Sequence, residues 1–197
     1  AYLSNMNEYL DSVIKRDPAA RSRLNVLLNY PGVKAVFFYK LSHSLWSLNL
    51  YVFARMISQF ARFITGVEIH PGAEIGKNLF LDHANSIVIG ESSIIGDNCT
   101  IYHGVTLGGL SPSENSQDQV GSKRHPTIED NVIIGCQATI LGPITIGKCS
   151  RIGASVVVLK DIPAFTTVVS ANTTKLINKD KDSTFKPYAV KDIDHVK

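Results

Sequence analysis

The chain has 197 residues, of which 44% are hydrophobic and 19% charged, and this composition excludes a disordered chain and is typical of a soluble globular protein. Its net charge of +3 is too small to indicate nucleic-acid binding, and no run of 18 apolar residues predicts a membrane span. The first residues lack the basic start and apolar core of a signal peptide, so we expect a cytoplasmic protein.

Three cysteines, Cys99, Cys136 and Cys149, have neither a CxxC spacing nor the Cys/His spacing of metal ligands. An odd number of such residues is typical of small buried or coil-lining residues in a reducing compartment. We therefore expect no zinc site and no other metal site.

Residues 1–64 predict a helical domain of three or four helices. Asp17-Pro18 predicts a helix start, because Asp accepts free backbone N–H groups and Pro suits the first turn. Tyr30-Pro31-Gly32 predicts a break. We expect this domain to cap an open strand edge. Two further helices are indicated by apolar faces, Val33, Val36, Phe37, Leu41, Leu45 and Leu48 on one and Phe53, Ile57, Phe60 and Ile64 on the next.

Aliphatic residues then recur at every sixth position, many of them followed by Gly. This period fits neither a helix of 3.6 residues per turn nor an alternating strand, and it is typical of a parallel β-helix of hexapeptide repeats. We therefore predict an α+β chain with the β-helix at residues 65–170. A β-sandwich would need six coincidental matches in the last block. The positions are Ile69, Ile75, Ile89, Ile95, Ile101, Leu107, Ile128, Ile134, Ile140, Ile146, Ile152 and Val158.

Two insertions interrupt the six-residue spacing. The first adds two residues around Asp82-His83-Ala84-Asn85, and the second lies between Leu107 and Ile128 and ends in Lys123-Arg124-His125-Pro126. Insertions in solenoids form loops on one face, often the binding face, so we expect the chemistry at these two places. The spacing ends at Lys160, and residues 171–197 are expected to form a charged C-terminal tail.

Several separate motifs in the same order resemble the serine O-acetyltransferase family. That family has an N-terminal helical domain and a left-handed parallel β-helix, forms homotrimers or dimers of trimers, and has its active sites between subunits. The resemblance implies transfer of acetyl from acetyl-CoA to L-serine, giving O-acetyl-L-serine for cysteine biosynthesis. The motifs are Arg16-Asp17-Pro18-Ala19, Gly66-Val67-Glu68-Ile69-His70-Pro71-Gly72-Ala73, Leu81-Asp82-His83-Ala84, Tyr102-His103-Gly104-Val105-Thr106-Leu107-Gly108-Gly109 and Arg124-His125-Pro126.

The resemblance implies His83 as the catalytic base and Glu68 as its carboxylate partner. An imidazole can take the proton of the serine hydroxyl because its pKa is near neutral, and a carboxylate on the far nitrogen orients the ring. Most family members carry Asp at the partner position. The alternative is that His83 is a turn residue and Glu68 a solvated carboxylate.

For the substrate, the resemblance places Asp17 and Asp82 near the ammonium group of serine and Arg124 and His125 near its carboxylate. Opposite charges at the two ends of the amino acid suit this arrangement. Asp17 has a second interpretation as a helix cap, and His125 has a second interpretation as a catalytic group beside the reacting centre.

For acetyl-CoA, the resemblance implies a groove along the coils at Gly109, Cys136 and Ala154, with Arg151 or Lys123 at the phosphates. Small residues let an extended pantetheine chain lie close to the backbone. The alternative is that tight corners alone require such residues.

The chain also departs from the family. Residues 110–122 are longer than the usual glycine-rich connection, which leaves homoserine or a sugar open as acceptors, and a non-catalytic trimeric scaffold is a further alternative. The chain ends in His195-Val196-Lys197 where many members end in Ile, so we expect no complex with O-acetylserine sulfhydrylase.

Overall fold

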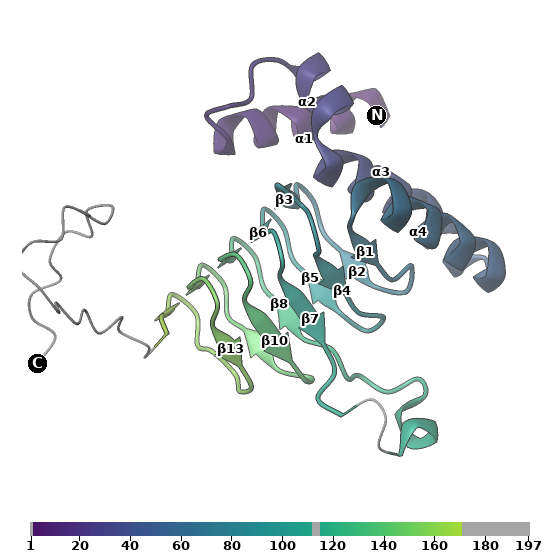
Figure 1. Cartoon of the computed structure of the whole chain (residues 1–197), viewed down its shortest axis with the longest axis vertical. Coiled ribbons are helices and arrows are strands. Elements are labelled where there is room, and N and C mark those ends of the chain that lie inside the picture. The colour runs from purple at the N-terminus through teal and green to yellow at the C-terminus, as the bar shows by residue number, and fades with distance from the viewer. Residues whose placement is uncertain (1, 112–114, 171–197) are drawn as a thin grey trace, which may run out of the picture.

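The computed structural model describes residues 2–111 and 115–170. Among these residues, four helices lie at one end of a stack of short strands (Figure 1). The expected order of helices followed by a parallel β-solenoid is confirmed. The helices are α1 (Tyr2–Arg16), α2 (Arg23–Asn29), α3 (Pro31–Ser47) and α4 (Tyr51–Thr65), and a 3-10 turn, η1, spans Ser116–Gln119.

The coils stack to form three parallel sheets, and each of the first four coils adds one strand to every sheet, whereas the last adds β13 to the first and β14 to the third. The first sheet is β1 (Glu68–Ile69), β4 (Val88–Ile89), β7 (Thr106–Gly108), β10 (Thr139–Leu141) and β13 (Val157–Val158). The second is β2 (Glu74–Ile75), β5 (Ile94–Ile95), β8 (Thr127–Ile128) and β11 (Thr145–Ile146). The third is β3 (Phe80–Asp82), β6 (Thr100–Tyr102), β9 (Ile133–Ile134), β12 (Arg151–Ile152) and β14 (Thr167–Val168).

Three corners join the sheets, and we number them in chain order. Corner 1 joins the first sheet to the second (residues 70–73, 90–93, 109–126 and 142–144), corner 2 joins the second to the third (76–79, 96–99, 129–132 and 147–150), and corner 3 leads back to the first (83–87, 103–105, 135–138 and 153–156). Both insertions predicted from the sequence therefore lie at corners.

The aliphatic residues of the six-residue spacing form the core of the solenoid. In the first sheet, Ile89 pairs with Leu107 and Leu107 with Ile140, and all three side chains are fully buried. Burial of such a side chain contributes roughly 1.5–3 kcal/mol. Because each coil supplies only one such residue per sheet, the coils stabilise one another.

The helices satisfy the carbonyl groups of the first coil. In a parallel sheet the backbone groups of a strand point alternately to the two neighbouring strands, and the N–H of Glu68 donates to Ile87 O of the second coil. The first coil has no earlier coil to donate to its carbonyls, and side chains of the helices supply the donors instead. Ser58 Oγ donates to Ile69 O (2.9 Å), Tyr39 OH to Ala73 O (2.7 Å) and Arg16 Nη2 to Asn78 O (2.6 Å).

The prediction that Asp17-Pro18 starts a helix was wrong. Asp17 follows the end of α1, and its Oδ1 accepts the N–H of Ala19 (2.8 Å), which favours a turn. The cap of α2 is Ser22, whose Oγ accepts the N–H of Asn25 (3.2 Å). The break at residues 30–32 is confirmed, since α2 ends at Asn29 and α3 begins at Pro31.

The predicted apolar faces were only partly right. Val33 and Val36 are buried, but α4 buries its small residues Ala54, Ser58 and Ala61. Small side chains let the helices approach each other and the first coil closely, so the large apolar side chains of this pair point outward. The exposed members of the two predicted faces are Phe37, Leu41, Leu48, Phe53, Phe60 and Ile64.

The solenoid continues past the end of the six-residue spacing. Ile162 forms a bridge to Ile146, and β14 pairs with β12. Ile162 and Val168 are again six residues apart, but the step from Val158 to Ile162 is only four residues, which interrupts the spacing in the sequence. The predicted tail at 171–197 lies outside the described residues, and the boundaries of the three predicted domains stay predictions. In the part of the chain that the structure describes, no helix has both the length and the apolar composition needed to cross a membrane.

We predict that Ser58→Ala lowers the free energy of unfolding by about 1–3 kcal/mol, because the buried carbonyl of Ile69 loses its donor. Urea unfolding followed by circular dichroism measures the change. The matched control is Ser47→Ala, whose exposed Oγ donates only within α3 to His43 O. Equal effects of the two substitutions would show that the edge carbonyl needs no donor.

Candidate active site

The first insertion turns the chain sharply at corner 3. His83, Ala84 and Ser86 have φ values of 55°, 60° and 59°, a left-handed conformation that non-glycine residues seldom adopt. Asp82 ends β3 immediately before this bend. As a result the side chain of His83 is 75% exposed, with Nε2 3.9 Å from Oδ2 of Asp82. The insertion thus presents an imidazole beside a carboxylate at the surface.

A second carboxylate lies at the same corner, because the turn after α1 brings Asp17 there. The hydroxyl of Tyr30 donates to Oδ2 of Asp17 (2.5 Å). Burial, this hydrogen bond and the charges of Asp17 and Asp82 raise the pKa of Tyr30 to about 12, so the phenol stays protonated. We had considered Tyr30 only as part of a helix break, and no spacing in the sequence links it to Asp17.

Glu68 has a different partner in the single chain. Its Oε2 lies 3.1 Å from Nη1 of Arg62, in the last turn of α4. The His83 ring instead contacts that of His103, one coil further on, with the ring centroids 5.9 Å apart. Among the described residues, no hydrogen bond or ion pair joins His83 to Glu68, and the predicted pair stays a prediction.

The second insertion delivers a basic pair to corner 1. Ser92 Oγ accepts the backbone N–H groups of Arg124 (3.0 Å) and His125 (3.1 Å). The guanidinium of Arg124 pairs with the carboxylate of Glu91 and donates to Gln119 O (3.2 Å). A cavity of about 300 Å³ opens beside this pair. Its lining includes Trp46, Glu74, Glu91, Ser92, Lys123 and Arg124.

His125 is held against Ser92. Its Nδ1 accepts the backbone N–H of Ser92 (3.2 Å) and lies 2.9 Å from Ser92 Oγ. Burial, followed by the positive charge of Arg124, lowers the pKa of His125 below its usual value, so the neutral ring is favoured at pH 7. Ser92 and Glu91 were missed in the sequence, where a corner serine and a surface glutamate carry no distinguishing pattern.

Lys123 fastens the end of the second insertion to corner 1. Its ammonium donates to the carbonyls of Ser92 (2.6 Å), His125 (2.5 Å) and Pro126 (3.2 Å), which uses all three N–H bonds. A role at the CoA phosphates would require these bonds to break, and that role stays a prediction.

The other residues predicted for acetyl-CoA are divided between two corners and a sheet. Cys136 and Ala154 lie in successive coils of corner 3, and the N–H of Ser155 donates to Cys136 O (2.8 Å). Gly109 lies at corner 1, where an added Cβ would meet only Arg124 O at 3.6 Å. Arg151 is exposed on β12. Within the described ranges, no group of three or more His, Cys, Asp or Glu side chains is arranged to hold a metal ion.

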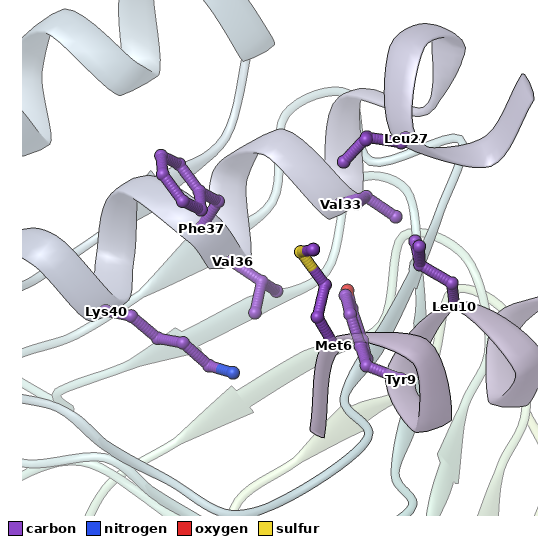
Figure 2. Close-up of a pocket in the computed structure, with 8 residues that line it drawn as sticks. All are labelled: Met6, Tyr9, Leu10, Leu27, Val33, Val36, Phe37 and Lys40. Carbon is purple, nitrogen blue, oxygen red and sulfur yellow. The ribbon is translucent and has the colours of Figure 1, made fainter. Parts of the chain in front are cut away.

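An apolar cavity of about 110 Å³ lies away from both clusters, in the helical part (Figure 2). Met6, Tyr9 and Leu10 of α1 face Val33 and Val36 of α3 across it. None of the predicted site residues lines this cavity. It is a gap in helix packing and not part of the candidate site.

Comparison with known proteins decides the family. The family model described as "Bacterial transferase hexapeptide (six repeats)" matches residues 125–160 of the chain. The serine acetyltransferase of Helicobacter pylori strain J99 is 50% identical over 172 residues, which are 87% of this chain and 96% of that protein. The chain belongs to the serine acetyltransferase family. It is thereby placed among acyltransferase enzymes. A Mycobacterium tuberculosis serine acetyltransferase is 50% identical over 85% of this chain and 70% of that protein.

Solved serine acetyltransferases share the fold. The soybean enzyme complexed with serine has 41% identity and a TM-score of 0.79, over 86% of this chain and 67% of that one. The Neisseria gonorrhoeae enzyme in complex with serine has 37% identity and a TM-score of 0.78, over 86% of this chain and 66% of that one. This chain thus spans about two thirds of the length of those structures.

The chain also contains a half-buried histidine, His70, whose titration is predictable. Burial lowers the pKa of His70 to about 4, whereas the pKa of a histidine in an unfolded chain is about 6.5. The native state therefore resists protonation, and stability present above about pH 6.5 is lost as the pH falls towards 4.

We predict that His70→Asn reduces this loss by about 1–2 kcal/mol between pH 7 and pH 4.5, a value discounted because the ring is only half buried. Asparagine keeps an acceptor for the N–H of Gly72, which His70 Nδ1 accepts at 3.0 Å, but cannot titrate. Urea unfolding at a series of pH values measures the difference. Parallel pH profiles for the variant and the parent protein would contradict the prediction.

Proposed function

We propose that this chain transfers the acetyl group of acetyl-CoA to the hydroxyl of L-serine, in cysteine biosynthesis. The proposal is based mainly on one observation. Asp17, Asp82 and an exposed His83 lie together at corner 3, and Arg124 lies at corner 1. These groups match the ammonium, hydroxyl and carboxylate of one amino acid. Membership of the serine acetyltransferase family supports the same reaction.

The transfer needs one base and no covalent enzyme intermediate. His83 takes the hydroxyl proton as the serine oxygen attacks the thioester carbonyl, and the imidazolium returns it to the departing CoA thiolate. Glu68 stabilises the imidazolium once its ion pair with Arg62 has broken. That exchange is feasible because an exposed ion pair such as Arg62–Glu68 is worth only about 0–1 kcal/mol.

Asp17 and Asp82 bind the ammonium group of the substrate. Tyr30 supports this role because its hydroxyl fixes the Asp17 carboxylate while leaving further acceptor positions on both oxygens. Arg124 binds the substrate carboxylate, since Glu91 and Gln119 O use only some of its five N–H bonds.

The active site is completed between subunits of a homotrimer or a dimer of trimers. The two clusters lie at opposite ends of the strands of the first sheet, a face of about five extended residues, or about 16 Å. One amino acid cannot span that distance, because its ammonium nitrogen and its carboxylate carbon are both bonded to the same Cα atom. Corner 1 of one subunit must therefore meet corner 3 of another. The exposed His83 and the outward apolar side chains of α3 and α4 support self-association.

The same arrangement accommodates acetyl-CoA. Cys136 and Ala154 lie along corner 3, and a neighbouring corner 1 contributes Gly109, so the groove runs between two subunits. Arg151, exposed on β12, is the cation we assign to the phosphates. No step of this transfer needs a metal ion.

The second insertion bears on the choice of acceptor. Gly121 and Ser122, near its end, line the cavity beside Arg124, so the insertion contributes to the acceptor pocket. Homoserine and a sugar, the two alternative acceptors, would be distinguished from serine there. Release of thiol from acetyl-CoA, measured with serine, with homoserine and with no acceptor, separates these activities from a non-catalytic scaffold.

We predict that His83→Ala lowers kcat at least about a hundredfold, as expected for a lost general base, while the oligomer stays intact. Steady-state thiol release and size-exclusion chromatography measure the two properties. Ser86→Ala in the same bend is the matched control and should keep its activity. Full turnover by His83→Ala would refute the mechanism.

We predict that Arg124→Ala raises the KM for serine about 10–100-fold, because a hydrogen bond to a charged group contributes about 1.5–3 kcal/mol. The KM for acetyl-CoA should change less than about twofold. Arg23→Ala, which breaks an exposed pair with Asp11, is the control. The assignment fails if acetyl-CoA binding collapses while the serine response stays normal.

A further inference from the structure

Ser92 has one hydrogen left to donate, and the geometry gives it one acceptor. A serine hydroxyl has two acceptor lone pairs and one O–H donor. Its Oγ already accepts the N–H groups of Arg124 (3.0 Å) and His125 (3.1 Å). The remaining contact of Oγ is with Nδ1 of His125 at 2.9 Å, so the hydroxyl donates to that nitrogen.

A second donor reaches the same nitrogen. The backbone N–H of Ser92 points to Nδ1 of His125 at 3.2 Å. A nitrogen that accepts two hydrogen bonds carries no proton of its own. The neutral ring of His125 therefore carries its hydrogen on Nε2.

The ring also lies close to the backbone of the preceding strand end. A Cβ added to Gly90 would fall 2.2 Å from Nε2 of His125, so the glycine is required for this ring position. Glu91 and Arg124 pair next to the ring, and Lys123 holds the carbonyl of His125. The ring is fixed by contacts on its Nδ1 side, and Nε2 remains for a ligand.

We propose that Ser92 is a positioning residue that holds His125 in the Nε2–H tautomer, which makes His125 a hydrogen-bond donor to the carboxylate of the acceptor substrate. The same tautomer excludes His125 as a second general base, because Nε2 has no free lone pair and Nδ1 is occupied. The identity of the carboxylate rests on the proposed function, whereas the tautomer rests on Ser92 alone.

The tautomer is measured directly by 15N NMR of the imidazole groups in the substrate-free protein between about pH 6 and 8. The signals of His125 are identified by their loss in His125→Gln. We expect an unprotonated Nδ1 and a protonated Nε2. A protonated Nδ1 would overturn the proposal, whether or not the protein acetylates serine.

Kinetics test the consequence for binding. We expect Ser92→Ala to raise the KM for serine about tenfold, with the KM for acetyl-CoA unchanged, because loss of one fixed donor removes about 1.4 kcal/mol of binding. Ser92→Thr retains the hydroxyl and should recover most of the affinity. The matched control is Ser93→Ala, because Ser93 is the next residue and its buried Oγ has no hydrogen-bond partner in the described part of the chain. A normal KM in Ser92→Ala, or an equal change in Ser93→Ala, would refute the positioning role.

Two substitutions of the ring separate a donor from a base. Glutamine can place an N–H near the position of Nε2 but cannot act as a base at neutral pH, and phenylalanine can do neither. We expect His125→Gln to keep a lower KM for serine than His125→Phe, with similar kcat in both. A fall in kcat of a hundredfold or more in both variants would identify a base and overturn the proposal. If the unmodified protein releases no thiol with serine, the proposed function fails while the tautomer result stands.

Discussion

The direction of the backbone hydrogen bonds in the coils determines how the rest of the molecule is placed. In a parallel sheet the backbone groups of a strand point alternately to the two neighbouring strands, and the first coil has a neighbour on one side only, so it presents carbonyls that no strand can satisfy. Helix side chains satisfy several of them, and Arg16, the last residue of α1, donates to Asn78 O of the first coil and also to Cys99 O of the second. The next residue is Asp17. The contact that caps the solenoid therefore also delivers a carboxylate to corner 3, and a structural requirement at the edge fixes one part of the substrate site.

The corners carry the chemistry because the sheets cannot. Within a sheet, the side chain that points inward belongs to the core, and an extra residue would reverse which side chains face inward. At a corner, extra residues leave the register unchanged. Both insertions are of this kind, and Glu68 of β1 still pairs with Val88 of β4 across the first of them. The two polar clusters consequently lie at opposite ends of the same strands. The residues proposed for the active site are therefore all present in one chain, but they lie too far apart in it to contact one substrate.

The sequence was sufficient where the determining information is local and periodic. The six-residue spacing gave the coils, and its two interruptions gave the corners that hold His83 and Arg124. It was insufficient where a partner is distant in the chain. Asp17 was given a helix-cap interpretation beside its substrate role, and its contact with Tyr30, thirteen residues away, was not predicted. The apolar faces of α3 and α4 were assigned to the interior because amphipathic spacing shows that a face is apolar and does not show what covers it. Ser92 was missed because its role depends on backbone groups more than thirty residues away.

Two histidines of the candidate site have opposite surroundings, and that difference supports the different roles proposed for them. His83 stands on a strained bend with its only described ion-pair partner, Asp82, at 3.9 Å, so both the ring and its nitrogens remain accessible to a substrate hydroxyl and to a carboxylate from another element. His125 is half buried between Arg124 and Ser92, and its Nδ1 is occupied twice. Placing a proton on His125 would put a second positive charge beside Arg124 and break the contact with Ser92. The environment that makes His125 a good donor to a carboxylate thus makes it a poor base, which supports the proposal that His83 takes the proton of the substrate hydroxyl.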